Sequence, residues 1–212
     1  MSSRHSILEP GNLLILQERE RHLLRMFRRL GVEKLEGLRV FEAGCGGGYN
    51  LRLMLQWGAR PEDLAGIDID ETSVEYCREH TADVRIHAGS ADDIPEADAS
   101  FDLTIAFTLF SSVPDEAVSQ GIAREMVRIT RPGGHIVIYD MRRTNPWNPG
   151  VHKITRDAVR RWFPACPLRT SSLTLVPLLA RPLGRRAPAL YGPLAAIPPL
   201  RSHALYVLRR QA

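Results

Sequence analysis

Hydrophobic residues recur along the chain with two different periods. Between residues 13 and 30, leucines and Phe27 recur at helical spacing with Glu and Arg between them, which predicts an amphipathic helix that ends at Gly31. The short apolar runs that follow are bounded by glycines or turn residues, and runs of this length indicate buried strands. The expected strands are residues 38–43, 64–69, 84–88, 101–107 and 135–139, and the expected helices are residues 50–57, 73–80 and 115–130. Because strands and helices alternate, the pattern predicts a parallel sheet covered on both faces.

The pattern changes in the last third of the chain. Residues 145–150 are rich in Asn, Pro and Gly and predict a turn-rich loop, after which Thr155 is expected to cap a short helix that ends before Pro164. Residues 171–176 and 203–208 alternate partly with a period of two and are candidates for two final strands. The segment between them is rich in Pro, Leu and Arg and is expected to be irregular.

Two expected boundaries rest on single turns. Thr72 is expected to cap the helix 73–80. Pro132-Gly133-Gly134 is expected to break the helix 115–130 before the strand 135–139.

Charge is distributed unevenly. Residues 1–140 carry 15 Lys and Arg against 23 Asp and Glu, whereas residues 141–212 carry 13 against the single Asp157. The basic last third favours an anionic acceptor, or peripheral contact with an anionic membrane surface. Three distant cysteines without a CxxC pair or a His cluster predict neither disulfides nor a metal site, and are typical of a cytoplasmic protein. No signal peptide and no apolar stretch long enough to span a bilayer is found, so the protein is expected to be soluble.

The strongest chemical signal is the glycine-rich turn at residues 40–48, Val-Phe-Glu-Ala-Gly-Cys-Gly-Gly-Gly. Glycines directly after a strand let the backbone approach a ligand closely. The third glycine of the NAD fingerprint is replaced by Tyr49, and the Gly-Lys-Ser/Thr ending of a phosphate-binding loop is absent. Glu42 at the end of the strand favours a cationic ligand over a pyrophosphate.

Further motifs follow in order. Asp68 ends the second strand about 20 residues after the glycine turn, where an acid can accept both ribose hydroxyls of an adenosine; the alternative is a turn residue there, with Asp70 as a helix cap. Gly-Ser-Ala-Asp-Asp-Ile-Pro follows at residues 89–95, Ser-Phe-Asp begins at Ser100, and Arg-Pro-Gly-Gly occupies residues 131–134.

Together these motifs resemble class I S-adenosylmethionine-dependent methyltransferases, in particular the methyltransferase type 11-like branch, over roughly residues 35–140. The resemblance implies an α/β fold of the Rossmann-like, doubly wound kind, with a mostly parallel seven-stranded sheet and an antiparallel last strand. It implies one methyltransferase domain that consists of an N-terminal helical cap (1–36), an S-adenosylmethionine-binding core (37–140) and a basic substrate-side segment (141–212).

The resemblance also assigns cofactor contacts to individual residues. Ser90 stands where this branch often has Asp, which shifts the expected adenine contact to Asp92 or to backbone groups. The full set implied for S-adenosylmethionine is Glu42 for its ammonium; Gly44, Cys45 and Gly46 for its methionine part; Asp68 for the ribose; and Ile69, Ala91, Asp92 and Phe107 for the adenine and the floor of the site.

Methyl transfer from a sulfonium needs alignment and exclusion of water, and only a hydroxyl acceptor additionally needs a general base. Asp140, at the end of the fifth strand, and His152, in the following loop, are the candidate bases. The alternatives are that Asp140 pairs locally with Arg142 or Arg143 and that His152 is a solvated loop residue.

The loop after Asp140 offers candidate contacts to the acceptor in Arg142, Asn145 and Trp147, which suit a sugar or another ring-bearing polar molecule. We therefore expect O-methylation of a glycan or another small polar acceptor, which the basic last third suggests is phosphorylated or lipid-linked. The alternatives are a nucleic-acid methyltransferase, disfavoured because no Asn/Asp-Pro-Pro-aromatic motif follows the fourth strand, and a non-catalytic partner subunit that binds the cofactor.

Overall fold

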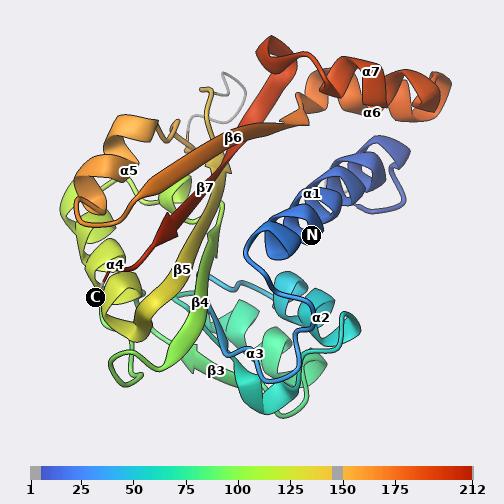
Figure 1. Cartoon of the computed structure of the whole chain (residues 1–212). Coiled ribbons are helices and arrows are strands. Elements are labelled where there is room, and N and C mark those ends of the chain that lie inside the picture. Colours follow the sequence, from blue (N-terminus) through green and yellow to red (C-terminus); the bar gives the residue numbers. More distant parts are fainter. Residues whose placement is uncertain (1–5, 145–149, 212) are drawn as a thin grey trace. The chain divides into compact units, whose positions relative to one another are not determined.

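The computed structural model describes residues 6–144 and 150–211 (Figure 1). Within these residues, seven strands form one sheet in the order β3-β2-β1-β4-β5-β7-β6. The strands are β1 (Val40–Ala43), β2 (Leu64–Asp68), β3 (Arg85–Ala88), β4 (Phe101–Phe107), β5 (Thr130–Met141), β6 (Leu168–Leu175) and β7 (Arg201–Arg209). The helices are α1 (Pro10–Arg29), α2 (Tyr49–Gln56), α3 (Glu71–His80), α4 (Glu116–Ile129), α5 (Arg156–Trp162), α6 (Pro177–Arg186) and α7 (Tyr191–Ala195).

The sheet is parallel except for β7. β1 pairs in parallel with β2 and β4, β2 pairs with β3, and β4 pairs with β5. β7 runs antiparallel to both of its neighbours: Arg210, directly after β7, exchanges backbone hydrogen bonds with Gly133 and Gly134 of β5, and Arg209 N donates to Pro167 O, directly before β6. This is the doubly wound, mostly parallel sheet with an antiparallel last strand that the sequence predicts.

The chain divides into two compact units by its internal contacts. The larger unit comprises residues 34–170 and the chain from residue 206 onward, and the smaller comprises residues up to 33 together with residues 171–205. The division into a helical cap, a cofactor-binding core and a substrate-side segment stays a prediction.

In the larger unit, helices cover both faces of the sheet. α4 and α5 lie beside each other on one face, and α2 and α3 lie on the other (Figure 1). All four residues of β1 are buried, as expected for a central parallel strand. The carboxylate of Asp115 accepts the N–H groups of Ala117 and Val118 and so caps α4. Thr155 caps α5 by accepting from Ala158 N at 3.1 Å, as the sequence predicts.

The smaller unit is built on a close contact between α1 and α6. A side chain at Gly11 would overlap the backbone of Ala180, and one at Gly184 would overlap the backbone of Gly11, so the two helices meet through glycines. Deeper in this unit, the buried Glu18 accepts a hydrogen bond of 2.6 Å from the Tyr191 hydroxyl.

Three local expectations are wrong. α3 begins at Glu71 with Asp70 at the N-cap position, so Thr72 lies inside the first turn and does not cap the helix. β5 begins at Thr130 and includes the Pro-Gly-Gly turn: Phe101 pairs with Thr130 and Leu103 pairs with His135, so the extra residues of β5 form a bulge between these two pairs. The segment 177–200 contains α6 and α7, in which Pro177 occupies the first helical turn, where no amide partner is needed.

Candidate functional site

The turn between β1 and α2 contains three glycines with a positive φ: Gly44 at +69°, Gly46 at +48° and Gly48 at +77°. The carbonyl of Ile67 accepts the N–H groups of Gly44 at 2.8 Å and Cys45 at 3.0 Å, which fastens the start of the turn to β2. A Cβ at Gly48 would overlap Cys77 Sγ of α3, so the turn and α3 are tightly packed. The turn is therefore tightly packed, and among its glycines only Gly46 has open space at the position of a side chain.

Asp68 joins this turn to the end of β2. Its Oδ2 accepts from Gly46 N at 2.7 Å and its Oδ1 accepts from Asp70 N at 2.9 Å. The nearest atom that a Cβ at Gly46 would meet is Asp68 Oδ2, at 4.0 Å, so the space beside this carboxylate is open. The next side chain, Ile69, is 76% exposed although it is apolar. An open backbone, a carboxylate and an exposed apolar side chain together fit an adenosine.

Glu42 lies buried beneath the turn. Its side chain is 1% exposed, and its Oε1 accepts from Asn50 Nδ2 at 2.5 Å. Asn50 is also buried, as the second residue of α2. The sequence motifs assign Asn50 no role, although its position at the start of the helix after the turn is a signal that indicates one.

The connection from β3 to β4 carries the residues expected at the adenine. Ala91 is buried and Asp92 is exposed. Gly121 of α4 lies directly beside Asp92, since a Cβ at Gly121 would come 2.7 Å from Asp92 Cβ. Asp92 is thus held next to α4.

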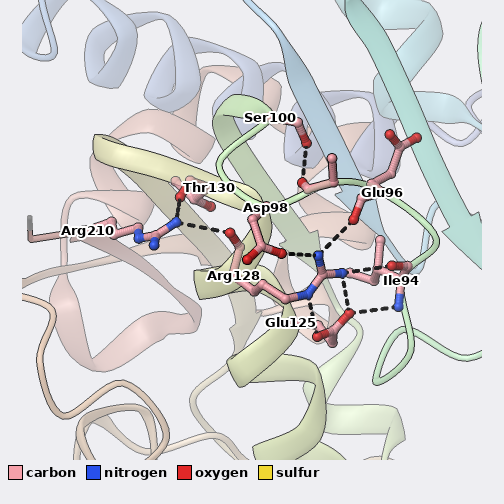
Figure 2. A network of polar contacts seen from close by, with 9 residues as sticks. Ile94, Glu96, Asp98, Ser100, Glu125, Arg128, Thr130 and Arg210 are labelled. Carbon is pink, nitrogen blue, oxygen red and sulfur yellow. Dashed lines mark hydrogen bonds and ion pairs between the residues drawn. The ribbon is translucent and has the colours of Figure 1, made fainter.

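A polar network fixes the second half of this connection (Figure 2). Ile94 N donates to Glu125 Oε2 at 2.9 Å, and the carbonyl of Ile94 accepts from Arg128 Nη2 at 2.8 Å. Arg128 also donates to the carbonyl of Glu96 and to Asp98 Oδ1, both at 2.7 Å. The Glu125–Arg128 pair of α4 therefore positions the connection that carries Ala91, although nothing in the local sequence pattern indicates this.

Asp140 lies fully buried at the carboxyl end of β5. Its Oδ2 accepts from Ser111 N at 3.1 Å and its Oδ1 from Met141 N at 2.7 Å. His152 comes near because its N–H donates to the carbonyl of Ser111 at 3.0 Å. Burial raises the pKa of the Asp140 carboxyl, and the hydrogen bonds from Ser111 and Met141 and the nearby His152 oppose this rise.

The backbone of His152 thus lies near Asp140, with Ser111 as a common neighbour that the sequence pattern does not indicate, while the His152 side chain is exposed. Close by, the buried Phe107 at the end of β4 packs against Tyr139 with ring centroids 5.6 Å apart. Among the candidate acceptor contacts, Arg142 is partly exposed, whereas Asn145 and Trp147 lie outside the described residues.

The comparisons with known proteins agree with this geometry. A family model of the methyltransferase domain matches residues 41–138, which include the glycine turn, Asp68 and the network of α4. Residues 41–138 are a class I methyltransferase domain. S-adenosylmethionine is its cofactor. A structural relative, geranyl diphosphate methyltransferase, was solved in complex with S-adenosylmethionine; it has a TM-score of 0.61 and 15% identity, and the match covers 81% of this chain and 77% of that one.

Two curated relatives are similar in sequence to the methyltransferase domain. The ubiquinone biosynthesis O-methyltransferase of Mesorhizobium japonicum is 32% identical over 61% of this chain and 51% of the relative. The demethylmenaquinone methyltransferase of Staphylococcus aureus is 33% identical over 60% of this chain and 52% of the relative. The match thus spans about half the length of each relative. An S-adenosylmethionine-dependent methyltransferase from Mesorhizobium loti shares the fold, with a TM-score of 0.60, 18% identity and coverage of 86% of this chain and 95% of that one.

Proposed function

We propose that the chain is an S-adenosylmethionine-dependent O-methyltransferase that acts on a hydroxyl group of a small-molecule acceptor. The observation that carries the proposal is the buried carboxylate of Asp140, whose pKa is raised and which lies beside His152 at the carboxyl edge of the sheet. Ligands of doubly wound sheets bind at this edge, near the point where the strand order reverses between β1 and β4.

The residues of the glycine turn fit the cofactor, which supplies a methyl group already activated on a sulfonium. The N–H groups of Gly44 and Cys45 are bonded to Ile67 O, so these two residues would contact the methionine part through their Cα and carbonyl groups. Asp68 would accept the ribose hydroxyls at the open space beside Gly46.

The remaining roles follow from position and chemistry. Glu42 would lower the electrostatic energy of the cofactor's ammonium group, Ile69 would pack on the adenine, and Ala91 would meet the adenine edge with a backbone group. Asp92, which is held beside α4, would contact the adenine edge from that position, and Phe107 would line the floor of the site.

Asp140 would act as the general base. The cofactor would supply a methyl group whose bond to sulfur breaks, leaving S-adenosylhomocysteine, and Asp140 would take up on a carboxylate oxygen the proton that the acceptor hydroxyl loses. A carboxylate whose pKa is raised is a stronger base than one in water, and removal of such a base typically lowers the rate by about 10²- to 10⁴-fold. The names of the curated relatives make quinone-type acceptors the first class to test, and sugars, the acceptors favoured by the sequence, are the second.

The test combines cofactor binding with turnover. Calorimetric titration should show binding of S-adenosylmethionine and S-adenosylhomocysteine but not of NAD; absence of binding by both adenosyl compounds would contradict the proposal. Asp140→Asn should leave that binding unchanged while it lowers turnover of a hydroxyl acceptor about 100-fold or more. The acid limb of the wild-type rate profile should lie above pH 3.8, the usual value of an aspartate, because the folded pKa is raised. Equal turnover by Asp140→Asn would remove this residue from the mechanism.

A further inference from the structure

The smaller unit exposes an unusually apolar stretch of chain. From Leu178 to Pro199, the exposed positions carry apolar side chains, proline or glycine, with the exception of two arginines. Three large aliphatic side chains protrude: Leu178 is 65% exposed, Leu190 51% and Ile197 44%. We call these exposed residues the 178–199 surface; they are Leu178, Pro182, Arg185, Arg186, Pro188, Ala189, Leu190, Gly192, Pro193, Ala196, Ile197, Pro198 and Pro199.

The packing inside the unit explains why these side chains face outward. Ala180, Tyr191 and Ala195 fill the small core together with Leu175, so the opposite sides of α6 and α7 are left at the surface. The chain before α1 adds to the exposed apolar residues. The ion pair between Glu9 and Arg185 brings this end of α1 to the end of α6, and Leu8, directly before Glu9, is 88% exposed.

The charged members of the 178–199 surface are arginines, and the acidic side chain that lies beside it, Glu9, is 13% exposed and paired with Arg185. After Asp157 the sequence contains no Asp or Glu, and Arg185 and Arg186 are the charged members of the surface. An apolar surface bordered by arginines and free of acidic side chains complements an anionic lipid surface.

We propose that the 178–199 surface docks on a bilayer that contains anionic phospholipid. Leu178, Leu190 and Ile197 would enter the boundary between headgroups and acyl chains, while Arg186 would remain at the level of the phosphates. The segment would lie in the interface, because α6 has ten residues and no helix among the described residues is long and apolar enough to cross a membrane.

Side-chain chemistry favours a bilayer over a protein partner. Interfaces between proteins are enriched in aromatic residues and carry about one hydrogen bond per 100–200 Å². The 178–199 surface has no exposed aromatic side chain and, apart from its arginines, no side chain that can form a hydrogen bond. Aliphatic residues and arginine are sufficient for contact with lipid, where a defined set of hydrogen-bond partners is not needed.

The experiment measures co-sedimentation of the full chain with vesicles of phosphatidylcholine and phosphatidylglycerol in a 70:30 ratio and with vesicles of phosphatidylcholine alone. We expect the wild type to bind the mixed vesicles more tightly. The triple variant Leu178→Ser, Leu190→Ser, Ile197→Ser should weaken its partition coefficient about 10- to 100-fold. Arg186→Gln should reduce the preference for the mixed vesicles and leave binding to phosphatidylcholine unchanged.

A matched control separates the surface from general hydrophobicity. Leu24 of α1, in the same unit, is 44% exposed, the same fraction as Ile197. Leu24→Ser should bind like the wild type, whereas Ile197→Ser alone should bind more weakly. Circular dichroism and thermal unfolding check that each variant is folded.

The proposal is overturned if the folded wild type does not sediment with mixed vesicles, or if the triple variant binds as tightly as the wild type. Concentration-dependent self-association without vesicle binding would assign the surface to a second copy of the chain and would equally overturn it. Because the readout is lipid binding, the result does not depend on the proposed methyl transfer.

Discussion

Replacement of Arg128 by Met should destabilise the protein by about 3 kcal/mol. The side chain of Arg128 is 30% exposed, and it donates hydrogen bonds to the carbonyls of Ile94 and Glu96 and to the carboxylates of Glu125 and Asp98. The side chain of Asp98 is 77% exposed, so its ion pair contributes close to nothing. Each lost hydrogen bond from the charged, partly buried guanidinium costs about 1 to 2 kcal/mol, and the bonds to the two carbonyls and to the Glu125 carboxylate make up most of the total.

Thermal unfolding is the first assay for this variant. For a chain of about 200 residues, a change of 3 kcal/mol corresponds to a decrease in Tm of roughly 6–12 °C. Arg124→Met is the matched control, because Arg124 lies one turn earlier on α4 and is exposed; its Tm should change by less than about 2 °C. Calorimetric titration should also show weaker binding of S-adenosylmethionine by Arg128→Met, since the connection that carries Ala91 loses its attachment.

Acidification gives an independent check. Hydrogen bonds from Arg128 lower the pKa of Glu125 below its usual value of 4.5. A carboxyl with a lowered folded pKa adds stability above the unfolded value and loses it as the pH falls through the folded value. The difference in Tm between wild type and Arg128→Met should therefore narrow below pH 4.5. A Tm for Arg128→Met within 2 °C of that of Arg124→Met would refute the assignment of Arg128 as the residue that positions this connection.

Two further outcomes can be measured on the same protein. Gly48→Ala should destabilise it by more than about 2 kcal/mol in chemical unfolding, because the added Cβ would overlap Cys77 Sγ. The control is Gly37→Ala: Gly37 has the same φ of +77° but no atom within 4 Å of the added Cβ, so this variant should lose only about 1 kcal/mol. Equal losses of unfolding free energy in the two variants would contradict the packing argument. Burial lowers the pKa of His203 to about 4, so between about pH 4 and pH 6.5 the unfolded chain binds more protons at this residue than the folded chain does. The free energy of unfolding of the wild type should therefore fall as the pH is lowered from about 6.5 to about 4. His203→Gln should lose less over the same range, and identical pH dependence of Tm in both proteins would show that His203 is not buried in its neutral form.

The elements of the larger unit could be predicted from the sequence because their signals are local. The run at residues 64–69 is apolar and short, and it is the strand β2 (Leu64–Asp68). The helix α6 could not be predicted, because Pro182 and Gly184 both argue against a helix interior. Tertiary contact overrides these preferences here, since Gly184 is the residue that allows α1 to approach.

The same distinction holds within the site. Glycines with positive φ and the acid at the end of β2 are defined by their place in the chain, and the structure brings Gly46 and Asp68 together. Asn50, Ser111 and Arg128 act through contacts between elements. Ser111 meets Asp140 across 29 positions of sequence, and Arg128 meets Ile94 across 34, so no periodic pattern indicates either contact.

The basic last third of the chain illustrates how composition can overstate free charge. Arg201 donates to the carbonyls of Ser172 and Ala195, and Arg210 donates to the carbonyl of Arg128, so these guanidinium groups satisfy backbone acceptors of the fold. Arg185 is paired with Glu9. The positive balance therefore does not by itself require an anionic acceptor. In the proposed membrane contact, the protruding aliphatic side chains would supply most of the affinity, and the arginines at the edge would supply the preference for anionic lipid.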